Sequence, residues 1–293
     1  MLMADIPHNE HMRMSLKIID PHVHFFNLAE GQYTWLQGEN PPAWPNLELI
    51  KQPISEKELL ESSDFTLAGI VHVEAGFDNN APINELNWLT AHLKKLPFKA
   101  ISYAQLDCAP VQFAKAINAL AHPHLIGIRD ITEGANAQRL LNPVCFSNLQ
   151  TLCLQGLYYE AQFELENTAI AAQLARYAKA LPQLKIIINH SGLPNNINNW
   201  QQSIRMLSAH NNIAIKFSGF ELLALNLQQQ QDCFETMLSY FGEQRIMFAS
   251  NFPVCQINAS YNDVWHSHQA LCKSNKIWHN LSYANAKHFY NMP

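Results

Sequence analysis

Short apolar runs alternate with amphipathic segments about eight times along this chain of 293 residues. The apolar runs that we expect to be strands are Lys17–His24, Ala68–Ala75, Ala100–Asp107, His124–Asp130, Leu157–Gln162, Lys185–His190, Asn212–Ser218 and Arg245–Ser250. Strands that alternate with helices pair in parallel and bury both faces of their sheet under the helices. Eight such units over roughly 275 residues predict an α/β fold, a single-domain (β/α)8 TIM barrel.

The segments between these runs carry helix signals. Ser55-Glu56-Lys57-Glu58 is a capping box that would open one helix. Asn142-Pro143 is typical of an N-cap followed by proline in the first turn. Leu86, Leu89, Leu93 and Leu96 would share one helical face. No glycine-rich nucleotide loop follows any strand, which argues against a doubly wound nucleotide-binding sheet.

Composition excludes several classes of partner. The chain is 48% apolar and 15% charged, with a net charge of −5 and no acidic or basic block, so nothing favours nucleic acid or an anionic membrane surface. No apolar run approaches the roughly 18–20 residues that a membrane span needs. Residues 1–15 predict a frayed or disordered tail without a secretory apolar core, ahead of a barrel over residues 16–293. We therefore expect a cytoplasmic protein, and its six cysteines, which include no C-x-x-C pair, to be reduced thiols.

One long irregular stretch, residues 25–53, follows the first expected strand. It contains Tyr33, Trp35, Trp44 and several prolines, and it is too apolar for a linker. Long loops of this kind in compact domains usually cover or build a site. We expect it to pack over the mouth of the barrel and shield a pocket suited to a small molecule.

Three histidines lie at the ends of expected strands. His22 and His24 are two residues apart in the first strand, so their side chains would point to the same face, and His190 ends the sixth. The carboxyl ends of barrel strands meet at one face, where active sites form. The other H-x-H pairs lie elsewhere: residues 122–124 precede a strand, and residues 266–268 fall in a helical pattern.

Converging neutral imidazoles either bind a divalent metal or share protons. A zinc ion would require a third protein ligand, which His190 could supply, and an open position for water. Both alternatives remain open from the residues alone: no cofactor is required, or one Zn or Mn ion is held by His22 and His24.

Several motifs together resemble the amidohydrolase-2 family. Within it the chain is similar to the branch of TIM-barrel metal-dependent hydrolases that contains sugar-acid lactonases and 2-pyrone-4,6-dicarboxylate lactonase. The motifs are Ile-Ile-Asp-Pro-His-Val-His at 18–24, Val-His-Val-Glu-Ala at 71–75, Gly-Ile-Arg at 127–129, Ile-Asn-His-Ser-Gly-Leu-Pro at 188–194, Ile-Lys-Phe-Ser-Gly at 215–219 and Arg-Ile-Met-Phe-Ala-Ser-Asn-Phe-Pro-Val at 245–254.

The resemblance implies roles for matching positions. His22, His24 and His190 match catalytic histidines, and Lys216 matches a polar residue that faces the pocket from the seventh strand. Arg129 is similar in position to arginines that hold substrate carboxylates, a task that suits the guanidinium fork. We further expect substrate contacts near the mouth from side chains at strand ends and in the cover, namely Glu74, Gln162 and Trp35.

Asn251 departs from the family pattern. Ser-Asp-Trp-Pro is usual there, and its aspartate is the general base or a metal ligand, whereas this chain has Ser-Asn-Phe-Pro at 250–253. An amide cannot take a proton near neutral pH but can hydrogen-bond a water or a hydroxyl. His190, with Asn251 positioning the water, could serve as the base instead. Asp20, in phase with the histidines, could orient one of them.

Other groups near the site remain as alternatives. Glu74 and Glu160 are expected near the rim, and Cys255 could form part of the pocket wall. The leading hypothesis is hydrolysis of a lactone of a small sugar acid or dicarboxylic acid by attack of water on the carbonyl. The alternatives are a metal-dependent decarboxylase or hydratase on the same barrel, and a non-catalytic ligand-binding relative. A small carboxylate or lactone is the expected partner, and a homo-oligomer is compatible with the sequence.

Overall fold

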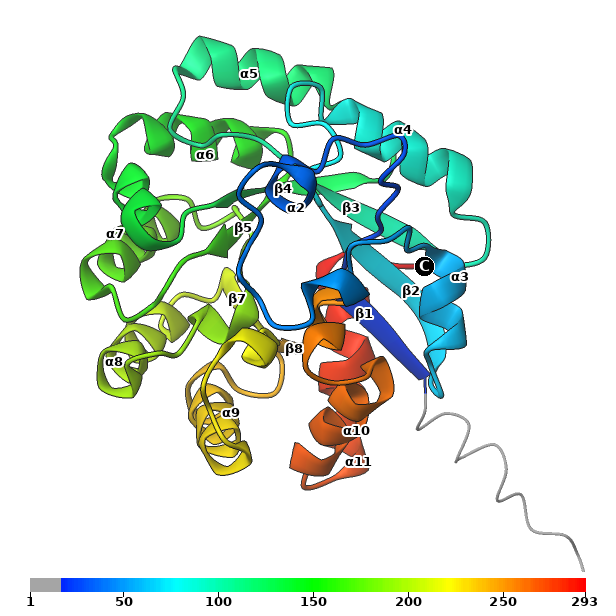
Figure 1. Ribbon diagram of the computed structural model, residues 1–293. Coiled ribbons are helices and arrows are strands. Elements are labelled where there is room, and N and C mark those ends of the chain that lie inside the picture. The colour runs from blue at the N-terminus through cyan, green and yellow to red at the C-terminus, as the bar shows by residue number, and fades with distance from the viewer. Residues whose placement is uncertain (1–16) are drawn as a thin grey trace, which may run out of the picture.

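The computed structural model describes residues 17–293, which form one barrel of eight parallel strands ringed by helices (Figure 1). Each strand pairs with the next in chain order. The strands are β1 (Lys17–Val23), β2 (Thr66–Val73), β3 (Phe98–Tyr103), β4 (Leu125–Ile131), β5 (Tyr158–Gln162), β6 (Ile186–Ile188), β7 (Ile213–Phe217) and β8 (Ile246–Phe248). The predicted single-domain TIM barrel is confirmed, whereas the predicted tail at residues 1–15 lies outside the described residues.

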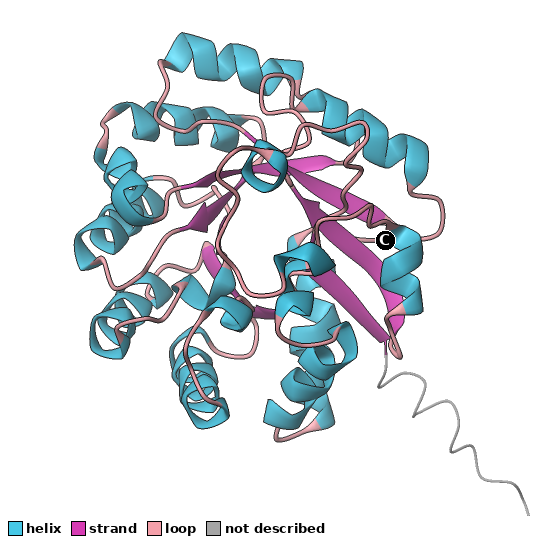
Figure 2. Ribbon diagram, viewed as in Figure 1, coloured by secondary structure: helices cyan, strands magenta, loops and turns pink. Residues whose placement is uncertain are grey.

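Helices connect the strands and cover the outside of the barrel (Figure 2). The α-helices are α2 (Thr34–Gln37), α3 (Glu56–Glu61), α4 (Ile83–His92), α5 (Pro110–Ala119), α6 (Val144–Leu154), α7 (Thr168–Ala180), α8 (Ile197–Ser208), α9 (Leu227–Phe241), α10 (Tyr261–Leu271), α11 (Asn275–His279) and α12 (Asn285–Phe289). Short 3-10 turns are η1 (Leu47–Leu49), η2 (Gly134–Leu141), η3 (His190–Gly192), η4 (Phe220–Leu222) and η5 (Val254–Ile257), and η6 (Asn280–Ala284) is a π-helical turn.

All eight predicted strands exist, with errors at their ends. The third was predicted to run to Asp107 but ends at Tyr103, because the Asp130 carboxylate accepts a hydrogen bond from the Leu106 amide at 2.8 Å and stabilises a turn there. The capping box at Ser55 is present and opens α3. Helix α4 ends at His92, so Leu93 and Leu96, the last two leucines of the predicted helical face, lie in the loop that follows the helix.

The first and last strands meet at their carboxyl ends. A single parallel bridge joins Val23 to Phe252, and the His24 amide donates to the Phe252 carbonyl at 2.7 Å. The Asn251 amide donates to the His22 carbonyl at 3.0 Å. Three of the predicted site residues therefore lie on this seam, which closes the barrel at the active-site face.

The opposite end of the barrel is filled by the C-terminal segment. A buried cluster inside the barrel combines strand residues with Ala286, Phe289, Tyr290 and Met292 from the end of the chain. The strand residues of this cluster are Ile19, Val71, Val73, Ile101, Ile126, Tyr158, Ile187, Ala214 and Met247. The last residues thus plug the floor beneath the site.

The irregular stretch after β1 crosses the other end of the barrel, as predicted (blue in Figure 1). The Trp35 indole donates to the Ala75 carbonyl at 2.7 Å, and its ring lies 5.9 Å from that of Trp44. Over residues 17–293, none of the helices combines the length and the apolar character that a membrane crossing requires.

We predict that Tyr290→Ala lowers the free energy of unfolding by about 3–5 kcal/mol, because it removes a fully buried ring from the barrel floor and leaves a cavity. Urea denaturation followed by circular dichroism measures this. The control is Val111→Ala, at a side chain that is 83% exposed, which should change the free energy by less than about 0.5 kcal/mol. Equal effects of the two substitutions would contradict the assignment of Tyr290 to the floor.

Candidate active site

A cavity of about 590 Å³ opens at the carboxyl ends of the strands, beneath the segment that contains Trp35 and Trp44. Seven of the nine predicted site residues line it: His24, Trp35, Glu74, Arg129, Gln162, His190 and Asn251. The other two, His22 and Lys216, are fully buried and do not line it. Cys255 is likewise buried and is not part of the wall.

An irregularity in β1 sets the direction of its side chains. The pairing of β1 with β2 shifts register between Asp20 and Val23. Asp20 therefore does not orient a histidine ring, contrary to the expectation from strand phase. Its carboxylate accepts hydrogen bonds from the Ser250 hydroxyl at 2.5 Å, the Ser250 amide at 3.2 Å, the His22 amide at 3.2 Å and the Tyr261 hydroxyl at 3.1 Å. Burial raises its pKa to about 6.

The position of the proton on His24 follows from its partner. Its Nδ1 lies 2.7 Å from the Val73 carbonyl oxygen, which can only accept, so Nδ1 carries the hydrogen. In the neutral ring the lone pair is then on Nε2, which lies 3.3 Å from Oδ1 of Asn251. His24 therefore presents a proton acceptor at the cavity.

A chain of buried polar groups runs from the barrel floor to His22. The Tyr290 hydroxyl donates to Oε1 of Glu160 at 2.6 Å, and the Lys216 ammonium donates to Oε2 of Glu160 at 2.6 Å. Nζ of Lys216 lies 3.3 Å from Nδ1 of His22. Glu160 was expected near the rim, but it is fully buried inside the barrel, because alternate residues of β5 point inward.

His190 belongs to a left-handed turn that follows β6, not to the strand. Four successive residues, His190 to Leu193, have φ between 48° and 68°. Such conformations cost about 1–3 kcal/mol per non-glycine residue and cluster at functional sites. The indole of Trp200 donates to the Ser191 carbonyl at 2.6 Å, and Nδ1 of His190 lies 3.2 Å from the Ser218 hydroxyl.

Gly219 allows His190 to occupy this position. A Cβ atom at residue 219 would lie 2.4 Å from Cβ of His190, and Gly219 itself has φ of +86°. Any other residue would push the histidine out of place. Gly219 is thus a steric requirement of the histidine that follows β6.

The Arg129 guanidinium is fully engaged by protein groups. Nε and NH2 bind Oε1 of Glu74 at 2.8 and 2.7 Å, and NH2 also donates to the Glu74 carbonyl at 2.8 Å. NH1 donates to Oε1 of Gln162 at 2.8 Å and lies 3.5 Å from Nε2 of His22. The fork that was expected to hold a substrate carboxylate therefore already holds Glu74.

A second arginine, which the sequence reasoning missed, faces the cavity from η2. Arg139 pairs with Asp107 at 2.7 Å and with Asp130 at 2.5 Å. Two carboxylates, Glu133 and Glu164, also line the cavity, and their hydrogen bonds come from an amide side chain and a backbone N–H. The cavity is thus richer in acidic than in basic groups, and its two arginines are neutralised.

Asn251 is held in a left-handed conformation, with φ of 60°, and its side chain lies between two polar partners. Its Oδ1 faces His24, and its Nδ2 donates to the carboxylate of Glu221. Burial raises the pKa of Glu221 to about 7. The sequence reasoning did not identify Glu221, although it follows the predicted seventh strand by only a few residues.

Burial lowers the pKa values of His22, His24 and His190 well below 6.5, and nearby cations lower them further. Lys216 contributes most after burial for His22, and Arg129 does so for the other two. All three imidazoles are therefore neutral near pH 7 and available to accept or donate a proton.

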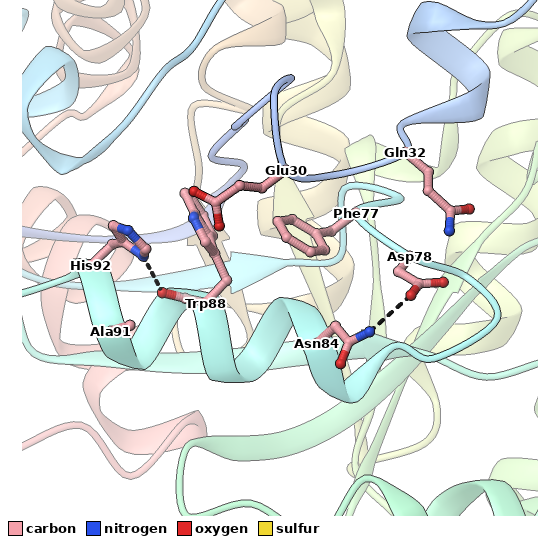
Figure 3. Close-up of a pocket in the computed structure, with 8 residues that line it drawn as sticks. All are labelled: Glu30, Gln32, Phe77, Asp78, Asn84, Trp88, Ala91 and His92. Atoms are coloured by element: carbon pink, nitrogen blue, oxygen red, sulfur yellow. Dashed lines mark hydrogen bonds between the residues drawn. The ribbon is translucent and has the colours of Figure 1, made fainter.

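A second, more open hollow of about 500 Å³ lies outside the barrel against α4 (Figure 3). Its floor includes the stacked rings of Phe77 and Trp88, and Asn84 donates to Asp78 at 2.9 Å across one end. It contains none of the predicted site residues. The chemistry of the histidines belongs to the larger cavity.

The donor set does not fit a catalytic metal. Both ring nitrogens of His22 face cations, Nζ of Lys216 and NH1 of Arg129, which would repel a divalent ion. The amide of Asn251 stands where a carboxylate ligand would be needed. Over residues 17–293, no group of three or more His, Cys, Asp or Glu side chains is arranged to hold a metal.

Comparisons with known proteins identify the class. The profile of the Amidohydrolase family matches residues 19–291, so the chain belongs to this family. It is 25% identical to an L-fucono-1,5-lactonase of Burkholderia multivorans over 267 residues, covering 84% of this chain and 85% of that protein. The predicted family and its hydrolase character are confirmed, whereas the substrate is not determined by this degree of identity.

Solved structures agree with the fold. A crystal structure of a Burkholderia multivorans amidohydrolase with bound Zn matches with a TM-score of 0.77 and 19% identity, covering 94% of this chain and 99% of that chain. A putative 2-pyrone-4,6-dicarboxylic acid hydrolase from Pseudomonas putida matches with a TM-score of 0.70 and 18% identity, covering 94% and 98%. These likenesses show the same barrel fold.

We predict that the rings of His22, His24 and His190 remain neutral at about pH 6, where histidines of an unfolded chain, with pKa of about 6.5, are mostly protonated. Because these pKa values are lower in the folded state, their contribution to stability is lost as the pH falls below about 6.5. ¹⁵N-histidine NMR, assigned with single His→Gln variants, measures the charge. An imidazolium signal from any of the three at this pH would contradict the assignment.

Proposed function

We propose that this protein is a lactonase that hydrolyses a small, uncharged, hydroxyl-rich cyclic ester by attack of water on its carbonyl carbon. The observation that carries the proposal is the group of neutral imidazoles at the base of a shielded cavity, with His24 presenting an unprotonated Nε2. The resemblance to an L-fucono-1,5-lactonase supports the reaction class.

His24 is the proposed proton acceptor. Its unprotonated Nε2 lies beside Oδ1 of Asn251 in the wall of the cavity, and the carbonyl of Val73 holds the ring in that tautomer. The sequence had favoured His190, whose Nδ1 contacts a hydroxyl that can either donate or accept. His190 is then placed to bind the attacking water or the leaving hydroxyl. In this mechanism the water proton moves to Nε2 of His24 and later to the alkoxide that leaves the ring.

Positive charge below the cavity would stabilise the negative charge that develops on the carbonyl oxygen. The ammonium of Lys216 lies 3.3 Å from Nδ1 of His22. The guanidinium of Arg129 adds a second fixed charge. Preorganised donors and charges in a dry site are a large source of catalysis. Burial lowers the pKa of Lys216 to about 8, so it remains mainly charged at neutral pH.

The charges in the cavity favour a neutral substrate over a dicarboxylate. Arg129 and Arg139 are already paired with carboxylates, and an anionic ligand would have to displace them. Glu133 and Glu164 would repel a carboxylate but accept hydrogen bonds from hydroxyl groups. Trp35 and Trp44 supply apolar surface for the C–H face of a sugar-like ring.

The alternatives differ in what they require of the site. A metal-dependent decarboxylase or hydratase needs a metal, and the donor set described above opposes one. A binding protein without turnover requires only the cavity. The replacement of aspartate by Asn251 is the observation in favour of that second candidate, and an activity screen separates it from the lactonase.

We predict that aldonolactones are hydrolysed in a pH-indicator assay and that EDTA leaves the rate unchanged. His24→Gln should lower kcat/KM by about 10²–10⁴-fold, the usual contribution of a general base. The control is Glu235→Gln, which removes one exposed charge on α9 and should leave the rate as it was. Absence of turnover across the panel, with lactones still raising the melting temperature, would favour the binding protein.

We predict a lower KM for neutral aldonolactones than for lactones that bear carboxylates. Glu74→Gln should narrow this difference, because it removes the carboxylate that occupies the Arg129 fork and frees its donors. Comparison of KM values for matched neutral and carboxylated lactones in both proteins measures the shift. An unchanged ratio of the KM values for neutral and carboxylated lactones would contradict the role of the Arg129–Glu74 ion pair in selectivity.

A further inference from the structure

Asn251 lies between His24 and Glu221, and its hydrogen bonds depend on which of the facing atoms carry a hydrogen. His24 donates from Nδ1 to Val73, so a neutral ring has no hydrogen on Nε2. Yet this Nε2 faces Oδ1 of Asn251, which also has no hydrogen, at 3.3 Å. A hydrogen bond between these two acceptors forms only when Nε2 gains a proton.

Glu221 determines this orientation of the amide. Its carboxylate accepts from Nδ2 of Asn251, which turns Oδ1 toward His24. If the amide were reversed, its NH2 would donate to the lone pair on Nε2 of His24. Oδ1 would then face Glu221 and could accept a hydrogen bond only from a protonated Glu221. Burial raises the pKa of Glu221 to about 7, so the ionised form that fixes the productive orientation is accessible near neutral pH.

We propose that Glu221 acts through the Asn251 amide as the positioning residue of a His24–Asn251–Glu221 relay, in which it supplies to His24 the negative charge that an aspartate at position 251 would supply directly. This inference rests on the proposed lactonase mechanism. When the water O–H bond breaks, the proton goes to Nε2 of His24 and the oxygen adds to the carbonyl carbon. The new N–H then donates to Oδ1 of Asn251, while Nδ2 donates to Glu221.

The relay returns to its starting state within one turnover. When the tetrahedral intermediate collapses, the ring C–O bond breaks, and the proton moves from Nε2 of His24 to the departing alkoxide. Glu221 gains and loses no proton in this cycle. In a catalytic triad a carboxylate likewise stabilises an imidazolium without accepting its proton, but it binds the ring nitrogen opposite the one that takes the proton. Here the amide of Asn251 transmits the charge of Glu221 to Nε2, the nitrogen that takes the proton, while Nδ1 stays bound to the Val73 carbonyl.

Other charged groups act on the relay from neighbouring elements. Arg129, His72 and His190 act on His24 and oppose its protonation, which increases the need for a compensating carboxylate. On the other side, burial raises the pKa of the Cys255 thiol on η5, and Glu221 interacts electrostatically with this thiol and helps to raise its pKa. Arg129 is already paired with Glu74, so it does not neutralise Glu221.

The test is a graded set of substitutions read by steady-state kinetics. Glu221→Gln keeps an acceptor for Nδ2 but removes the charge, and Glu221→Leu removes both. We expect kcat to fall at least about tenfold in the first and further in the second, with KM within about twofold, because the cavity wall does not include Glu221. Equal kcat values in wild type and both variants would overturn the relay.

A reciprocal exchange distinguishes the relay from a structural role. Asn251→Asp alone places two carboxylates in contact and should be less active than wild type. The double variant E221Q/N251D restores one acid and one amide in exchanged order, so the introduced carboxylate accepts directly from His24. We expect it to recover most of the kcat lost in E221Q. A double variant no more active than either single variant would overturn the proposal.

NMR tests the relay even if the protein hydrolyses no lactone. In E221L the freed amide should reverse and donate to Nε2 of His24, and the Nε2 shift should move upfield toward that of a hydrogen-bonded lone pair. An Nε2 resonance identical in wild type and E221L would show that Glu221 does not orient Asn251. Absence of turnover together with a shifted resonance would overturn the lactonase but retain the relay geometry.

Discussion

The carboxylate of Asp20 holds together the seam on which the site is built. Between β1 and the segment after β8 the backbone contributes the bridge from Val23 to Phe252 and the hydrogen bond from the Asn251 amide to the His22 carbonyl. The side chain of Asp20 adds hydrogen bonds to both sides of this junction. It accepts four hydrogen bonds, two of them from Ser250. Buried carboxylates are tolerated only when their oxygens are satisfied in this way. His22, His24 and Asn251 adjoin this junction, so their relative positions depend on it.

Two buried cations in the barrel interior are each paired with a carboxylate, and the histidines lie next to these ion pairs. Lys216 pairs with Glu160, and Arg129 pairs with Glu74, so each of these buried cations has one buried carboxylate. Ionising an imidazole among these pairs would add an unpaired positive charge in a poorly solvated place. The rings are therefore neutral at rest, and they are good acceptors only if a further carboxylate compensates the charge that forms.

The barrel and most of the cavity could be predicted from sequence because their signals are local. Apolar runs of strand length and the i, i+2 spacing of His22 and His24 do not depend on distant residues. The orientation of Asp20 could not be predicted, because a register shift in β1 alters the phase. Tyr290 contacts Glu160 across 130 positions, a pairing that only the closed barrel creates. Arg129 shows a different limit: its strand position predicted that it lines the cavity, but Glu74 and Gln162 decide whether its donors are free.

Asn251 and Glu221 are best understood as one unit. Asn251 alone suggests a lost base, because an amide cannot accept a proton. In contact with Glu221, however, an aspartate at position 251 would place two carboxylates together, and one of them would have to be protonated. The amide avoids this repulsion and leaves a single ionisable acid beside His24. The negative charge therefore lies on Glu221, one side chain further from His24 than residue 251. The local sequence around position 251 contains no sign of it.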